Sequence, residues 1–174
     1  SLIGMAIGSM FLAPLADKFG RRTIILTSLS LITTGMLLST FCQNAFQFGA
    51  MRLLTGFGIG GILVCLSVIT VEFSPLKWRT FCLTMFASGY PLGAVISGGI
   101  AVALIADFGW RAVFLFGAIC SGMMIPLVYI LMPESIDYML ANRTAGTLGK
   151  INKVLARMGH LAIAQLPPQQ SIAA

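Results

Sequence analysis

Charged residues are scarce in this sequence, at 9% of 174 residues. A soluble domain of this length carries roughly 25% charged residues, so the composition excludes an ordinary water-soluble globular protein. The mean hydropathy of +0.95 agrees with this exclusion, and several uncharged apolar runs reach the roughly 20 residues that span a bilayer. Because these runs are continuous and do not alternate with a period of two, the sequence predicts an all-α integral membrane protein.

Side chains that carry out catalysis or bind metals are scarce as well. All five carboxylates lie at the ends of apolar runs or in loops, and the one histidine, His160, lies near the C-terminus. The four cysteines stand singly in apolar runs, without metal-ligand spacing, where cysteine commonly acts as a small hydrophobic residue. We therefore expect no enzyme activity, no cofactor and no metal site.

The net charge of +6 could indicate nucleic-acid binding, but the positions of the cations argue against it. Three of the 11 Lys and Arg residues lie in residues 17–22, two in 72–79 and four after residue 136. Arg111 alone lies in a segment on the other side, and Arg52 lies inside an apolar run. Since cytoplasmic loops carry an excess of Lys and Arg, this distribution predicts an orientation with the C-terminal end in the cytoplasm, and no nucleic-acid partner.

The apolar runs predict five membrane spans, at residues 1–15, 23–41, 45–71, 81–106 and 112–132. Residues 136–174 contain four basic residues together with apolar residues at helical spacing, and this spacing predicts an amphipathic helix over 144–158 on the cytoplasmic surface. Because the sequence begins inside an apolar run, we expect a fragment that starts within a helix.

Arg52 is the most informative single residue, because a charge inside a span costs roughly 2.5–3.5 kcal/mol on insertion scales. It either donates hydrogen bonds to carbonyls of a neighbouring helix, or serves an anion site or proton coupling, and both interpretations remain open. Tyr90 precedes Pro91, which should kink its span. It is a candidate for a cavity wall, with a hydrogen bond to a neighbouring helix as the alternative.

Glycines in the third span match the dinucleotide-binding pattern G-x-G-x-x-G, at Gly56, Gly58 and Gly61. No strand precedes them and they lie in mid-span, so close helix packing through Gly56, Gly58 and Gly60 is the better interpretation. Gly89 and Gly93 form a similar stripe in the fourth span.

Charged residues flank the predicted cytoplasmic ends of the spans. Asp17, Arg21 and Arg22 lie beside the second span, and Glu72, Arg79 and Glu134 lie near the later cytoplasmic ends. They form either a solvated turn that sets the orientation or a salt-bridge latch, and the spacing does not decide between the two.

Four sequence blocks together resemble the major facilitator superfamily. They are Ala13-x-x-x-Asp17-Lys18-x-Gly20-Arg21-Arg22, Arg52-x-x-x-Gly56-x-Gly58-x-Gly60, Glu72-x-x-Pro75-x-x-x-Arg79 and Pro133-Glu134-Ser135. Ala13 stands where the family has glycine, and Lys18 where it usually has arginine. The resemblance implies that the spans are helices 2–6 of a twelve-helix fold. Residues 1–135 would then belong to the N-terminal half and 136–174 to the central cytoplasmic loop, with helix 1 and the C-terminal half as missing partners.

Further residues resemble the aromatic acid:proton symporter branch of that family. They are Gly89-Tyr-Pro-Leu-Gly93, Gly109-Trp-Arg-x-Val-Phe-Leu-Phe-Gly117 and Pro133-Glu-Ser-Ile-Asp-Tyr-Met-Leu. This likeness implies proton-coupled import of a benzoate or hydroxybenzoate across a bacterial inner membrane by alternating access. Arg52 would position the substrate or couple it to protons, and Tyr90 would line the cavity. The latch would comprise Asp17, Gly20, Arg21, Arg22, Glu72, Arg79 and Glu134.

Two rival functions remain open. The sugar-porter branch shares the Pro-Glu-Ser element and the Glu/Arg spacing, so the substrate could be a sugar or another metabolite. A membrane receptor or scaffold that transports nothing is the other rival, and it predicts no counterflow activity in vesicles.

Overall fold

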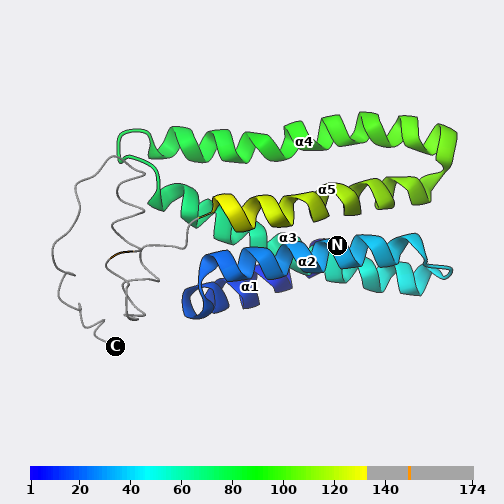
Figure 1. Cartoon of the computed structure of the whole chain (residues 1–174), viewed down its shortest axis with the longest axis horizontal. Coiled ribbons are helices and arrows are strands. Elements are labelled where there is room, and N and C mark those ends of the chain that lie inside the picture. The colour runs from blue at the N-terminus through cyan, green and yellow to red at the C-terminus, as the bar shows by residue number, and fades with distance from the viewer. Residues whose placement is uncertain (133–148, 150–174) are drawn as a thin grey trace. The chain divides into compact units, whose positions relative to one another are not determined.

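A computed structural model describes residues 1–132 and residue 149, and within them the chain forms five α-helices and no strand (Figure 1). The helices are α1 (Leu2–Phe19), α2 (Arg21–Thr40), α3 (Ala45–Glu72), α4 (Arg79–Phe108) and α5 (Trp110–Leu131). All five are long and apolar enough to cross a membrane, which confirms the expected all-α membrane architecture. The amphipathic helix predicted over 144–158 and the latch candidate Glu134 lie outside the described residues.

Two of the connections are single glycines in the left-handed region of backbone space. Gly20 has a φ of 93° between α1 and α2, and Gly109 has a φ of 79° between α4 and α5. Glycine adopts such a φ without steric cost, so one residue is enough to end one helix and begin the next. The expected loop around residues 17–22 is therefore shorter than the sequence indicated, because Asp17 belongs to α1 and Arg21 to α2.

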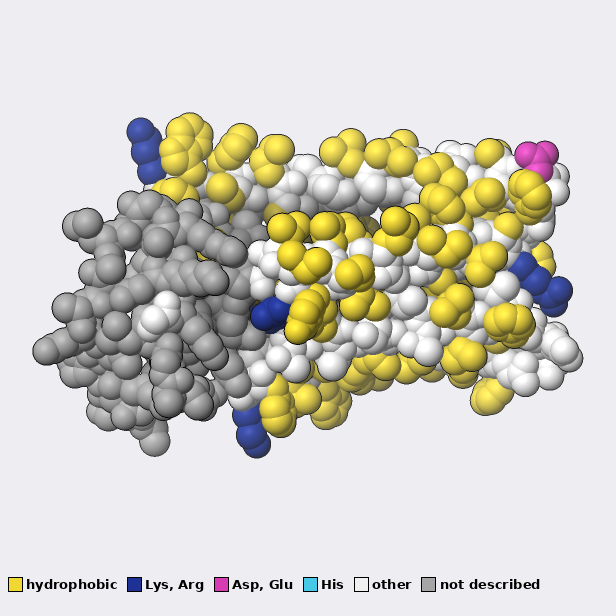
Figure 2. Space-filling model, in the orientation of Figure 1, with side chains coloured by type: hydrophobic (Ala, Val, Ile, Leu, Met, Phe, Trp, Pro, Cys, Tyr) yellow, Lys and Arg dark blue, Asp and Glu magenta, His cyan; other side chains and the backbone are white. Residues whose placement is uncertain are grey.

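Helix α3 lies at the centre of the described part, packed against α1 and α2, while α2 also packs against α5. A buried cluster joins the three central helices near one end, formed by Leu12, Ala16, Ile24, Ile25 and Cys65. We call this end the basic end, because Lys18, Arg21 and Arg22 lie there, and we call the opposite end, with the α2–α3 turn and Gly109, the distal end. On the face shown in Figure 2, Lys and Arg side chains gather at the two ends and hydrophobic side chains cover the length between them.

Glycines bring the backbones of α1 and α3 into close approach. A Cβ atom added to Gly60 would lie 2.9 Å from the Ser9 nitrogen, and one added to Gly8 would lie 2.8 Å from the Phe57 carbonyl carbon. On the α2 side, a Cβ at Gly58 would lie 2.8 Å from the Ser28 carbonyl oxygen. These contacts involve backbone atoms, which cannot move aside as a side chain can, so the helix spacing depends on the absence of side chains here.

Helix α4 differs from the other four, because none of its residues is buried by the described part of the chain. It continues through Pro91, and a Cβ at Gly89 or Gly93 would meet no atom within 4 Å among the described residues. The stripe of small residues expected on this span therefore has no partner within residues 1–132, in contrast to the glycines of α3.

Candidate functional site

Charged residues from three helices meet at the basic end. The Arg21 guanidinium, at the start of α2, donates a hydrogen bond through Nη1 to Oε1 of Glu72, at the end of α3. Its Nη2 atom lies 3.5 Å from Oδ1 of Asp17 in α1. The side chains of Arg21 and Glu72 are 13% and 19% exposed, whereas that of Asp17 is 74% exposed. Because water and salt screen an exposed pair more strongly, the Arg21–Glu72 contact is the stronger of the two.

Arg22 connects α2 to a different helix. Its Nη2 atom donates a hydrogen bond to the carbonyl oxygen of Tyr129, and its guanidinium carbon lies 4.8 Å from the centre of the Tyr129 ring. Tyr129 lies in the last turn of α5, where unsatisfied carbonyl groups favour a nearby cation. The two consecutive arginines therefore bind α2 to α3 and to α5.

The structure brings part of the predicted latch together. Asp17, Arg21 and Glu72 form one cluster, which we call the basic-end cluster, and Gly20 makes the turn beside it. Arg79 is exposed at the start of α4 and makes no ion pair with any described residue.

Glu72→Gln should perturb the protein more than Asp17→Asn. Glu72 accepts a shielded, charge-assisted hydrogen bond, and glutamine keeps the acceptor oxygen but removes the charge, so about 1 kcal/mol should be lost. The exposed Asp17 pair contributes about 0–1 kcal/mol in total, so Asp17→Asn should lose less. Denaturant unfolding in detergent would measure both variants, with Asp107→Asn as a control at the distal end. Equal effects of the two substitutions would contradict the ranking.

Aromatic rings gather at the distal end, between the start of α3 and the start of α5. Phe48 lies 6.0 Å from Trp110 and 5.4 Å from Phe114 between ring centres, and Trp110 lies 5.9 Å from Phe114. All three pairs meet edge to face, the arrangement that the ring quadrupoles favour. We call these three residues the distal aromatic cluster.

Arg52 lies one helical turn along α3 from Phe48 and contacts this cluster. Its guanidinium carbon is 4.3 Å from the centre of the Phe114 ring and 5.1 Å from that of Phe48. Within residues 1–132 no carboxylate lies in ion-pair range of Arg52, and no hydrogen bond joins its guanidinium to a helix carbonyl. The partially buried cation is therefore held by aromatic faces.

Arg52 can contact aromatic rings or bind a carboxylate, and these two kinds of contact differ in energy. A cation–π contact contributes roughly 0.5–2 kcal/mol, whereas a hydrogen bond between charged groups contributes about 1.5–3 kcal/mol, and a carboxylate can accept two of them in parallel. Because the N–H groups of a guanidinium lie in its plane, a carboxylate could bind Arg52 while the ring contacts remain. Both interpretations of Arg52, the structural one and the anion-binding one, stay predictions.

Tyr90 lies elsewhere in the described part. Its residue is 64% exposed on α4, and no contact among the described residues joins it to Arg52. The two substrate candidates named from the sequence therefore do not form one site within residues 1–132, and the cavity-wall role of Tyr90 stays a prediction.

Sequence reasoning missed Phe48 and Phe114, although a local signal was present. Phe48 and Arg52 are four residues apart, as are Trp110 and Phe114, so each pair shares a helix face. The approach of α3 to α5 at these four residues depends on tertiary packing and has no local signal.

Comparison with known proteins found a family model and curated relatives that match this chain. A family model described as Major Facilitator Superfamily matches residues 1–166. The chain is 28% identical over 158 residues to a gallate transporter of Pseudomonas putida, covering 91% of this chain and 35% of that protein. It is 27% identical over 179 residues to the 4-hydroxybenzoate transporter PcaK of Pseudomonas aeruginosa, covering 100% of this chain and 40% of that protein. The chain thus spans well under half the length of these relatives.

The solved structures show the same fold. The xylose transporter XylE of E. coli, in an inward-open conformation, matches with a TM-score of 0.69 at 20% identity, over 88% of this chain and 40% of that one. At this identity the likeness shows the arrangement of helices and does not bear on the substrate.

Proposed function

The chain belongs to the Major Facilitator Superfamily, and from this premise we propose that it is part of a secondary transporter that imports a small aromatic carboxylate together with protons. The chain is a multi-pass integral membrane protein, and its family and relatives indicate a transporter and not an enzyme. Relatives named as gallate and 4-hydroxybenzoate transporters support the substrate class. Their bacterial origin supports a place in the bacterial inner membrane, with the basic end in the cytoplasm.

The position of Arg52 is the observation that carries this proposal. A guanidinium held on two aromatic rings, without a carboxylate partner among the described residues, offers both of the contacts that an aromatic carboxylate needs. The charge would bind the carboxylate through parallel hydrogen bonds, and the neighbouring rings would pack against the substrate ring. In this proposal Arg52 positions the substrate or couples it to proton movement. Tyr90 lines another part of the substrate cavity.

The basic-end cluster would serve as the cytoplasmic latch. Arg21 and Glu72 hold α2 and α3 together at that end, so a conformational change that separates the ends of these helices has to break a shielded ion pair. In alternating access a substrate bound near the bilayer midplane becomes accessible to each side in turn. The proposed machinery needs helix 1 and a second six-helix half as partners, along with the bilayer and the proton gradient.

A sugar or another metabolite is the alternative substrate within the same family. The likeness to the xylose transporter concerns the fold alone. A receptor or scaffold with this fold would bind a ligand without moving it.

Uptake by the full-length parent protein tests the proposal. We expect cells that lack their own aromatic-acid carriers to accumulate labelled 4-hydroxybenzoate at acidic external pH when they express it. A protonophore should abolish the accumulation, because the proton gradient would then no longer drive it. Labelled xylose offered to the same cells tests the sugar alternative. If protein shown to be in the membrane does not take up 4-hydroxybenzoate, the aromatic-acid assignment is contradicted.

A further inference from the structure

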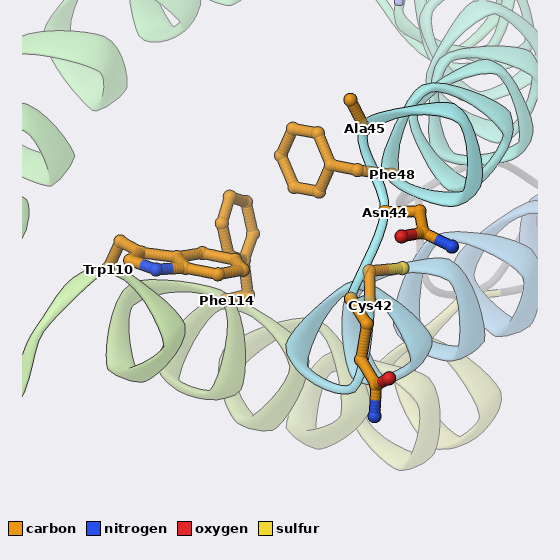
Figure 3. Close-up of a pocket in the computed structure, with 7 residues that line it drawn as sticks. Cys42, Asn44, Ala45, Phe48, Trp110 and Phe114 are labelled. Atoms are coloured by element: carbon orange, nitrogen blue, oxygen red, sulfur yellow. The ribbon is translucent and has the colours of Figure 1, made fainter.

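A cavity opens at the distal end, between the α2–α3 turn and the start of α5 (Figure 3). Its volume is about 470 Å³, within the range of roughly 300–1,000 Å³ that is typical of small-molecule sites. Its lining residues are Cys42, Gln43, Asn44, Ala45, Phe48, Trp110 and Phe114. The whole distal aromatic cluster therefore faces one hollow, with polar side chains on the turn beside it.

The polar side of the cavity can donate hydrogen bonds. Asn44 occupies the N-cap position of α3, but its side chain makes no capping hydrogen bond. Its amide group is exposed, and the first N–H groups of α3 have no acceptor within the helix. The start of a helix also carries a partial positive charge, so the helix end next to Ala45 favours an anionic group over a neutral one.

Two guanidinium groups contact the aromatic lining. Arg52 contacts Phe48 and Phe114 without lining the cavity itself, and the Arg111 guanidinium carbon lies 5.2 Å from the centre of the Trp110 ring. Asp107 is the acid nearest in sequence to Arg111, and no described acid forms an ion pair with either arginine. Two cations therefore lie next to the aromatic lining, and positive charge near a cleft favours the approach of small anions.

We propose that this cavity is a loading site for planar aromatic carboxylates, which the protein binds before they reach Arg52. This inference rests on the proposed function for the choice of ligand. The aromatic ring packs against Phe48, Trp110 and Phe114, and the carboxylate accepts hydrogen bonds from Asn44 and the start of α3. Phe48 and Phe114 touch both the cavity and Arg52, so movement of these two rings brings the carboxylate to the guanidinium.

Binding to the purified 174-residue chain in lipid nanodiscs tests the proposal. The chain has two tryptophans, so W78F leaves Trp110 as the only fluorescent indole, within the cavity wall. We expect 4-hydroxybenzoate to quench Trp110 saturably. Cyclohexanecarboxylate, which has the charge without the aromatic ring, and benzyl alcohol, which has the ring without the charge, should each bind at least about 10-fold more weakly.

Substitutions in the W78F background locate the site. Phe48→Leu and Phe114→Leu should each weaken binding at least about 10-fold. Phe46→Leu is the matched control, because Phe46 lies in the same helix turn, is 89% exposed and does not line the cavity. Asn44→Asp adds a negative charge next to the cavity, so it should weaken binding of the carboxylate. Because aspartate is a good helix cap at this exposed position, the variant should stay folded. It therefore tests the site even if the Leu variants are unstable.

The outcomes separate this inference from the proposed function. Saturable binding by the 174-residue chain that Asn44→Asp weakens, together with no uptake by the parent protein, would leave the site standing and remove the transport proposal. Absence of Trp110 quenching in the 174-residue chain, with its helices shown to be intact by circular dichroism, would overturn the loading site. Equal affinity for benzyl alcohol or unchanged affinity in the Asn44→Asp variant would overturn it as well.

Discussion

Uptake of 4-hydroxybenzoate should fall about 10- to 100-fold in kcat/KM when Arg52 is replaced by leucine in the full-length parent protein. The proposed carboxylate contact contributes about 1.5–3 kcal/mol, and each 1.4 kcal/mol corresponds to a factor of about ten. Arg52→Leu retains an apolar side chain next to Phe48 and Phe114, and it removes a costly intramembrane charge. The protein should therefore still insert and fold, which the amount in the membrane and a thermal melt would verify.

Two companion variants distinguish a specific role from a general one. Arg52→Lys keeps the charge but loses the planar group that stacks on rings and binds a carboxylate through two parallel bonds, so we expect partial activity. Lys77→Gln is the matched control, because Lys77 is another cation beside an aromatic ring, 6.0 Å from the Trp78 ring centre, and lies outside both clusters. Wild-type uptake by Arg52→Leu would remove Arg52 from the proposed mechanism.

Gly60→Ala should destabilise the helix bundle by about 1–3 kcal/mol, the usual cost of an overpacked core. The added methyl group would lie 2.9 Å from the Ser9 nitrogen and even nearer to the Met5 carbonyl oxygen, and neither backbone atom can turn away. Helices α1 and α3 would have to move apart, which disturbs the buried cluster around Cys65.

Gly49→Ala is the matched control for this substitution. Gly49 lies in the same helix, and a Cβ there meets no atom within 4 Å among the described residues. Because alanine has the higher helix propensity, this variant should be neutral or slightly stabilised. Thermal unfolding followed by circular dichroism in one detergent measures both variants, and equal melting temperatures would show that the close approach at Gly60 does not limit stability.

The number and type of the helices could be predicted because a bilayer imposes strict local rules. Long uncharged runs such as 45–71 had to be helical, since lipid offers no partner for free backbone groups. The predicted helix ends were less accurate than the number of helices, because a charged residue at a membrane face is compatible with either a loop or a helix end. Asp17 and Trp110 were assigned to loops and lie in helices, since glycines at positive φ made the turns shorter.

The candidate site was only partly predictable from the sequence. Arg52 drew attention because an isolated charge in an apolar run is costly, and Glu72 because a family motif contains it. The ring cluster around Phe114 could not be predicted in this way, because phenylalanine is ordinary in a membrane span. Its role depends on which faces of α3 and α5 meet, and this is decided by packing between segments more than 60 residues apart.

The two single-glycine turns have a consequence for how the protein is made. Gly20 and Gly109 leave no free linker between α1 and α2 or between α4 and α5, whereas several residues flank α3 on each side. The chain thus consists of a hairpin, a single helix and a second hairpin. During synthesis each hairpin should leave the translocon as one unit, with its polar backbone already satisfied and its turn on one side of the bilayer. A bulky residue at Gly20 or Gly109 would then impair the insertion of the hairpin into the membrane before it affects transport.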